Sequence, residues 1–158
     1  MGLITWIENT GLAEYVRVSA YGYPAMITLH SLGLAIMVGL SVVLSMRVLG
    51  LYSVIPYSSL YKLLKIAWIG LVVNFISGSS LFAANATGLI VDWVFLLKMA
   101  MVIVGAIFVA LMQGELKTAL ASGNPEAAAE SSKLKVMAWV TIAAWTIGMV
   151  TGRLIAYL

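Results

Sequence analysis

Apolar residues run through the chain in four long stretches, at residues 24–49, 60–84, 91–112 and 136–158. A helix that crosses a bilayer needs about 20 mainly apolar residues, because the hydrocarbon core is about 30 Å thick. Helices are expected because lipid offers no hydrogen-bond partner to backbone N–H and C=O groups, and a helix pairs these groups within itself. Membrane strands would instead show alternating segments of about ten residues. The pattern predicts an all-α integral membrane protein, an up-down bundle of four transmembrane helices.

A shorter and more mixed segment, residues 1–22, precedes the first apolar stretch. Its apolar side chains, among them Trp6, are interspersed with the charged Glu8, Glu14 and Arg17. Such a mixture is typical of an amphipathic helix that lies in the membrane interface. A Tyr-Gly-Tyr-Pro turn follows, and its proline suits the first turn of the first span, where its missing N–H is not needed.

The connection between the last two spans, residues 113–135, has its own helical pattern. Residues 113–121 continue the third helix, and a Ser-Gly-Asn-Pro turn follows with Asn124 as N-cap and Pro125 at the first helical position. Residues 126–132 then begin the fourth helix. We therefore expect a helical hairpin that extends the bundle on the cytoplasmic side, within a single membrane domain of residues 1–158.

The composition supports a membrane protein. The chain is 63% hydrophobic and 9% charged, whereas a soluble domain carries roughly 25% charged residues. The absence of cysteine excludes disulfides, thiolate metal sites and cysteine nucleophiles. No basic cluster points to nucleic acid as a partner, and the first residues lack the basic region of a removable signal peptide.

The basic residues predict the orientation of the spans. The two loops that join spans one to two and three to four, with their flanks, hold Arg47, Lys62, Lys65, Lys117, Lys133 and Lys135. The positive-inside rule places these loops in the cytoplasm. We therefore expect a multi-pass protein of the bacterial inner membrane, with both termini in the periplasm and the lipid bilayer as its principal partner.

Three ionisable residues fall within the apolar stretches: His30, Lys98 and Arg153. Such residues are costly in lipid and point to function. His30 lies six residues after Pro24, which puts it roughly 9 Å below the outer end of its span. Lys98 and Arg153 lie at similar depth, and Asn74 of the second span approaches the same level. The outer half of the bundle is therefore the candidate site.

This group of side chains suits haem b. Neutral imidazole is a good axial ligand for haem iron, so His30 is the candidate metal ligand. The cations Lys98 and Arg153 would neutralise the two propionates. A single histidine excludes bis-His ligation within one chain, which leaves five-coordinate iron, a methionine (Met37 or Met149) as second ligand, or a ligand from another subunit.

The same residues allow simpler interpretations. His30 fits a polar contact between helices, Lys98 and Arg153 fit snorkelling side chains, and the two cations would also hold another amphipathic anion. Small residues recur at helical spacing beside His30 and in span four, as at Gly33, Gly148 and Gly152. Such stripes allow close helix packing, room for a flat cofactor, or formation of a homo-oligomer, and the spacing does not distinguish these uses.

Several short motifs resemble an uncharacterised bacterial family of small four-helix membrane proteins. The motifs are Val16-Arg17-Val18-Ser19, Tyr23-Pro24-Ala25, Thr28-Leu29-His30-Ser31-Leu32-Gly33, Gly39, Arg47-Val48-Leu49-Gly50, Ser77-Gly78, Leu81-Phe82, Phe95, Lys98-Met99 and Gly152-Arg153-Leu154-Ile155-Ala156-Tyr157. They are distributed over nearly the whole chain. The sequence departs from the family at Ser45, where an acidic residue is expected two positions before Arg47, and this leaves the ionic partner of Arg47 open.

The chain is more distantly similar to the HemJ-type protoporphyrinogen oxidases and to the CopD-type copper-resistance membrane domains, which share a first-span histidine and a third-span lysine. The HemJ-type resemblance implies that His30 is an axial ligand of haem b and that Lys98 is a site residue. It implies neither the oxidase reaction nor the copper role.

Three functions are consistent with this pattern. The first is a haem b protein that serves electron transfer or a porphyrin- or quinone-type oxidation, with a quinone or a redox protein as partner. The second is a structural or accessory membrane subunit without a cofactor, and the third is a transporter for a small ion or metal. The sequence does not decide whether the protein is an enzyme, although no Ser-His-acid set suggests a hydrolase.

Overall fold

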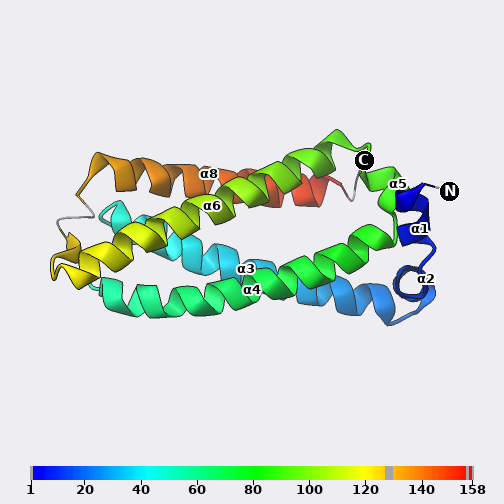
Figure 1. The fold of residues 1–158 in the computed structure, drawn as a ribbon, viewed down its shortest axis with the longest axis horizontal. Helices are drawn as coiled ribbons and strands as arrows, with labels where there is room; N and C mark the ends of the chain where they lie inside the picture. Colours follow the sequence, from blue (N-terminus) through cyan, green and yellow to red (C-terminus); the bar gives the residue numbers. More distant parts are fainter. Residues whose placement is uncertain (1, 127–129, 156, 158) are drawn as a thin grey trace.

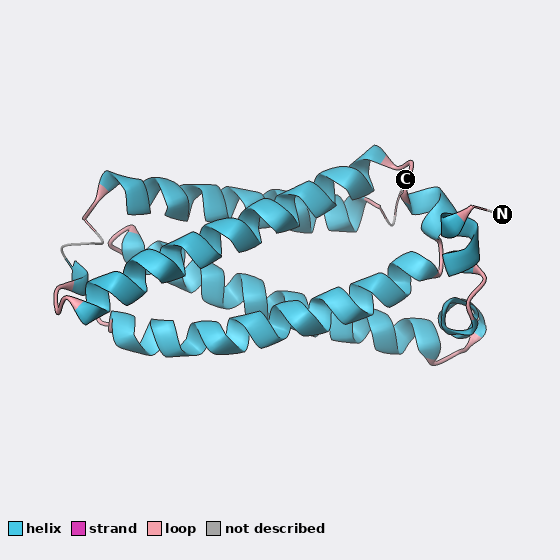
Figure 2. Cartoon of the chain, in the orientation of Figure 1, coloured by secondary structure: helices cyan, strands magenta, loops and turns pink. Residues whose placement is uncertain are grey.

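The computed structural model describes residues 2–126, 130–155 and 157, and over these residues the chain forms helices joined by turns, with no strand (Figure 2). The helices are α1 (Leu3–Glu8), α2 (Gly11–Val18), α3 (Gly22–Val48), α4 (Tyr57–Ala83), α5 (Ala86–Leu89), α6 (Trp93–Ala121) and α8 (Ser132–Leu154). Of these, α3, α4, α6 and α8 are long and apolar enough to cross a membrane. The all-α class and the four apolar helices predicted from the sequence are confirmed.

The four long helices lie side by side, and both chain termini lie at one end of the molecule (Figure 1). We call this the terminal end and the opposite one the loop end. Helix α3 packs most extensively against α4, and α6 against α8. The two pairs meet mainly through α3 and α8, with a smaller contact between α4 and α6. The bundle is therefore two helical hairpins joined mainly between α3 and α8 and, less extensively, along an α4–α6 seam.

Residues 1–22 differ from the single amphipathic helix expected there. The described part forms two short helices, α1 and α2, separated at Asn9 and Thr10. The Thr10 hydroxyl accepts a hydrogen bond from the backbone N–H of Ala13 at 3.4 Å, and the side chain of Asn9 donates to the backbone oxygen of Thr5 at 2.8 Å. These two contacts end one helix and begin the next.

The connection between α6 and α8 follows the expectation as far as residue 126. Helix α6 continues to Ala121, and Pro125 and Glu126 are helical, both as predicted. The turn at Glu130 and Ser131 then precedes α8, which begins at Ser132, whereas one continuous fourth helix was expected from residue 126. The Ser131 hydroxyl accepts from the backbone N–H of Leu134 at 3.3 Å and so forms the N-cap of α8. Residues 127–129 lie outside the described residues.

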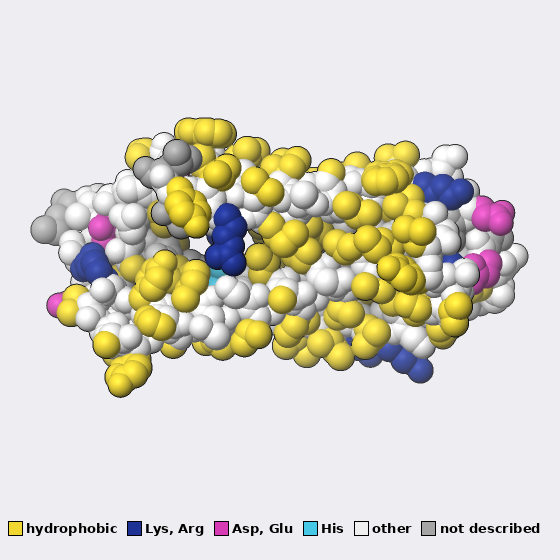
Figure 3. Space-filling model, turned by 180° about the vertical axis from the view of Figure 1, so that it is seen from behind, with side chains coloured by type: hydrophobic (Ala, Val, Ile, Leu, Met, Phe, Trp, Pro, Cys, Tyr) yellow, Lys and Arg dark blue, Asp and Glu magenta, His cyan; other side chains and the backbone are white. Residues whose placement is uncertain are grey.

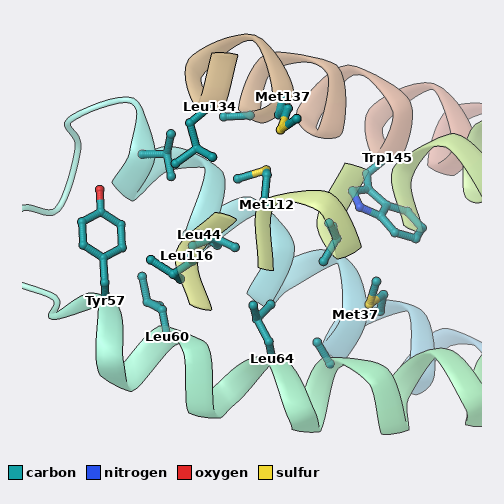
Figure 4. Close-up of a cluster of buried hydrophobic side chains, with 14 of the residues drawn as sticks. Met37, Leu44, Tyr57, Leu60, Leu64, Met112, Leu116, Leu134, Met137 and Trp145 are labelled. Carbon is teal, nitrogen blue, oxygen red and sulfur yellow. The ribbon is translucent and has the colours of Figure 1, made fainter. Parts of the chain in front are cut away.

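The hydrophobic core fills the loop half of the bundle. Figure 4 shows its buried side chains from all four long helices, from Tyr57 near the loop end to Trp145 and Met37 near the middle. Beyond that level the described residues contribute few buried side chains: residues 22–36 of α3 bury only Gly22 and Gly33, and α6 buries only Val94 before Gly105. The terminal half therefore has little apolar packing between the two hairpins.

Within the α3–α4 hairpin, two glycines bring the backbones together. A Cβ atom on Gly33 would lie 2.6 Å from the backbone oxygen of Gly70 and 2.7 Å from the backbone nitrogen of Asn74. Backbone atoms in mid-helix cannot move aside cheaply. The close approach of α3 to α4 therefore depends on the absence of a side chain at Gly33.

Substitution of Gly33 tests this approach. We expect Gly33→Ala to lower the free energy of unfolding by about 1–3 kcal/mol, the usual cost of overpacking. Gly39→Ala is the matched control, because a Cβ on Gly39 of the same helix meets nothing within 4 Å. Thermal unfolding in detergent, followed by circular dichroism, measures both. Equal melting temperatures for the two variants would contradict the close approach.

Candidate functional site

His30 of α3 is held by α4 through two reciprocal hydrogen bonds. Its ring Nδ1 lies 3.1 Å from the backbone oxygen of Asn74, and the Asn74 side-chain amide donates to the backbone oxygen of His30 at 2.8 Å. The Ser77 hydroxyl lies 3.5 Å from the same Nδ1. A carbonyl oxygen only accepts, so Nδ1 of the neutral ring carries the proton and Nε2 carries the lone pair.

Gly78 makes room for the imidazole. A Cβ atom there would lie 2.9 Å from Cε1 and 3.1 Å from Nδ1 of His30. The ring is half-buried and rests against the bare backbone of α4. Gly78 and the Asn74 carbonyl therefore fix the position of the ring from one side, and no hydrogen bond to Nε2 is made within the described part of the chain.

Lys98 reaches the same region from the other hairpin. The side chain is half-buried and extends across Gly152 of α8, where a Cβ atom would lie 3.4 Å from Cε and 3.7 Å from Nζ of Lys98. Figure 3 shows the histidine of the chain next to a Lys or Arg side chain in this region. Among the residues that the structure describes, no carboxylate pairs with the amine of Lys98.

A hollow lies between the hairpins at this level. Figure 3 shows it on the face opposite to that of Figure 1, with the only histidine of the chain at its edge and a Lys or Arg side chain inside it. On the loop side of this level lies Trp145, which is 1% exposed and whose indole lies against Gly105. Gly105 is seven residues, or about two helical turns, from Lys98.

An aromatic pair bridges the hairpins on the terminal side of the site. The rings of Phe82 in α4 and Phe95 in α6 stack with their centroids 5.5 Å apart. Phe82 lies about one turn beyond Gly78, and Phe95 about one turn before Lys98. The pair therefore spans the α4–α6 seam next to the polar residues, on the side nearer the chain termini.

Of the residues selected from the sequence, the structure brings His30, Gly33 and Asn74 together where α3 meets α4, and Lys98 lies across from them on the second hairpin. Gly33 is occupied by the backbone of α4, so it provides helix packing and no space for a cofactor. Met149 and Arg153 are exposed, Met149 to 40%, and Arg153 makes no ion pair with another described residue. Within the described chain, no group of three or more His, Asp or Glu side chains is arranged to hold a metal ion.

A second polar cluster lies at the loop end, around Arg47. Its guanidinium donates from Nε to the backbone oxygen of Ile55 at 2.8 Å and from Nη2 to Oε1 of Glu126 at 2.6 Å, and it lies 4.2 Å from the centroid of the Tyr57 ring. Ser45, where an acidic residue was expected, donates instead to the backbone oxygen of Ser41. The open question about the partner of Arg47 is therefore answered by Glu126, 79 residues away in the sequence.

The fold and this site indicate a multi-pass helical membrane protein with a polar site between two hairpins. Comparison with family models, with curated proteins and with solved structures finds no significant match for the chain. The family resemblance therefore stays a prediction.

Proposed function

We propose that the protein is a haem b protein of the bacterial inner membrane, in which Nε2 of His30 would ligate the iron and the terminal end would face the periplasm. The observation that carries the proposal is the fixed imidazole at the edge of a hollow. Metal-bound histidines commonly donate the other ring N–H to a backbone carbonyl, which orients the ring and raises its basicity. The contact between His30 Nδ1 and the Asn74 oxygen has this form.

The residues around the hollow fit such a group in part. His30 would ligate the iron, and Lys98 would hold a propionate through a charge-assisted hydrogen bond. The exposed Arg153 is placed to act only at the terminal surface. Met149, with an exposed side chain, is not used in this proposal, so His30 is the one protein ligand that we assign.

Haem b, when bound, supplies one-electron redox chemistry. The chain's own residues would orient it: the Asn74 carbonyl fixes the imidazole and Gly78 leaves room for it. The apolar Phe82–Phe95 pair and Trp145 lie on the terminal and loop sides of this level. Such a site suits electron transfer or a porphyrin- or quinone-type oxidation, with a quinone or redox protein as partner.

One observation favours a second candidate, a structural or accessory subunit without a cofactor. The two hydrogen bonds between His30 and Asn74 already give the histidine a role in joining α3 to α4. Interhelical hydrogen bonds of this kind stabilise membrane bundles by about 0.6–2 kcal/mol each.

The absorption spectrum of the purified protein separates the two candidates. From haem-replete cells we expect a Soret band that shifts on reduction with dithionite, and about one haem per chain by the pyridine haemochromogen assay, in keeping with a single histidine ligand. An unrelated four-span protein purified in the same detergent is the control. A colourless protein that also fails to take up added haemin would refute the haem proposal and favour the accessory subunit.

A further inference from the structure

Different parts of the structure lie on the different sides of the hollow. Trp145 lies on its loop side, and the Phe82–Phe95 pair bridges α4 and α6 about one turn from His30 and Lys98 toward the termini. On the opposite face, where α3 and α8 lie, Figure 3 shows the hollow open at the surface. The remaining direction is the terminal end, where the short helices lie.

At the terminal end, α1, α2 and α5 cover the end of the α3–α4 hairpin. Helix α5 crosses between the end of α4 and the start of α6, and α1 lies against it (Figure 1). The backbone N–H of Thr87 in α5 donates to Oε2 of Glu8 in α1 at 3.0 Å, and Arg17 of α2 lies 3.8 Å from the same carboxylate. Hydrogen bonding from Thr87, more than the charge of Arg17, lowers the pKa of the Glu8 carboxyl.

Helix α2 anchors this cover to the first hairpin. Ala13 and Val16 are fully buried where α2 contacts α3 and α4. A Cβ atom on Gly22, at the corner between α2 and α3, would lie 2.5 Å from the backbone oxygen of Tyr15. The cover is therefore packed directly onto the ends of α3 and α4.

The side chain of Lys98 extends toward the α3–α8 face, where the hollow is open. Its stem crosses the backbone of Gly152 in α8, so the amine of an α6 residue is presented at the α8 side of the hollow. A lysine in a span normally directs its amine toward water or an anion at the membrane surface. Here the amine lies against Gly152 of α8, and no described carboxylate pairs with it.

We propose that the ligand enters this hollow sideways from the lipid leaflet at the terminal end, through the mouth between α3 and α8, and that it is a membrane-dissolved amphipath with an anionic group for Lys98. The inference rests on the proposed site at His30. It adds that the ligand does not enter from the terminal end, where α1, α2 and α5 cover the first hairpin, and that the ligand partitions into lipid before it binds.

Spin labels test the route, because the natural chain has no cysteine and single-cysteine variants carry one label each. Gly152→Cys places the label at the mouth, where a Cβ meets Lys98 at an ordinary 3.4 Å. Leu32→Cys, two residues from His30 and 55% exposed, is the lipid-facing control at similar depth. Gly11→Cys, where a Cβ meets nothing within 4 Å, is the control on the surface of the cover.

Collision rates with oxygen, which concentrates in lipid, and with a water-soluble nickel chelate are measured in vesicles without ligand. We expect the label at Gly152→Cys to match that at Leu32→Cys, with high oxygen and low nickel accessibility. Nickel accessibility equal to that of Gly11→Cys would show an aqueous route and overturn the inference. These measurements need no haem, so they stand apart from the proposed function.

Added haemin then tests the occupant. We expect it to lower oxygen accessibility at Gly152→Cys and leave Leu32→Cys unchanged. If the label at Gly152→Cys has lipid-type accessibility but haemin does not change it, the lateral route stands and haem is refuted as the ligand.

The anionic group is tested with haemin and its dimethyl ester. The wild type should bind the acid about tenfold more tightly, as expected for one hydrogen bond between charged groups, and Lys98→Met should lose this preference. An unchanged preference in Lys98→Met would overturn the assignment of Lys98 to the anion.

Discussion

Replacement of His30 by alanine is expected to abolish the Soret band of the purified protein. Changes in the residues that orient a metal ligand weaken metal affinity by about 10–100-fold, and removal of the sole ligand should exceed that range. The variant also loses the hydrogen bond from Nδ1 to the Asn74 oxygen, but it keeps its own backbone oxygen as acceptor for the Asn74 side chain. Its stability should therefore fall modestly while haem binding is lost.

Asn74→Ala is the matched variant. It removes the donor to the His30 oxygen but leaves the backbone carbonyl of residue 74, which is the partner of the imidazole. We expect about 0.6–2 kcal/mol lower stability, with the Soret band retained. The pair of variants thus separates ligation from helix packing.

Absorption spectra and thermal unfolding of the two variants check this prediction, and added imidazole provides a rescue. Free imidazole should restore the Soret band of His30→Ala, because it can replace the missing ligand in the space left by the side chain. If both variants lose stability equally and neither changes the spectrum, His30 is a packing residue and the accessory function holds.

The features of the fold that the sequence predicted are those encoded by neighbouring residues. Four continuous apolar stretches predict four long helices, whichever of these helices contact one another. The level shared by His30, Asn74 and Lys98 follows from the constant rise of a helix. The break at Thr10 and the start of α8 at Ser132 also had local signals, since Thr10 and Ser131 are good N-cap residues, but the amphipathic pattern and Pro125 favoured other boundaries.

The features that were missed depend on which helices meet. The spacing of Gly33 in the sequence is consistent both with close helix packing and with space for a cofactor. The contact of Gly33 with the backbone of Gly70, which only the structure shows, favours helix packing. The exposure of Met149 depends on how α8 is rotated against α6. Phe82 and Phe95 stack across the seam although 13 positions separate them, and nothing in their surroundings predicts the pairing.

The largest effect on stability is expected for Arg47→Ala. Arg47 is 5% exposed and joins the end of α3 to Ile55 in the next loop, to Tyr57 at the start of α4 and to Glu126 between α6 and α8. A hydrogen bond from a charged donor contributes about 1.5–3 kcal/mol, and a cation–π contact about 0.5–2 kcal/mol. Together with the lost packing of the side-chain stem, we expect a loss of about 3–5 kcal/mol.

The ion pair itself should account for little of this loss. The side chain of Glu126 is 65% exposed, so water can take its place beside Arg47 in Glu126→Gln. Exposed pairs contribute about 0.2–1 kcal/mol and are screened by salt. We therefore expect a small, salt-dependent effect for Glu126→Gln and a large, salt-independent one for Arg47→Ala.

Unfolding in detergent, measured for both variants at low and high salt, tests this ranking. Lys62→Ala, which removes an exposed cation near the same end of the bundle, is the control and should change stability by less than about 0.5 kcal/mol. Arg47→Met separates the contribution of side-chain packing from that of the hydrogen bonds, because methionine keeps most of the apolar stem and removes the hydrogen-bond donors. If Glu126→Gln costs as much as Arg47→Ala, the cluster is held by the ion pair, and the contacts of Arg47 with Ile55 and Tyr57 contribute little.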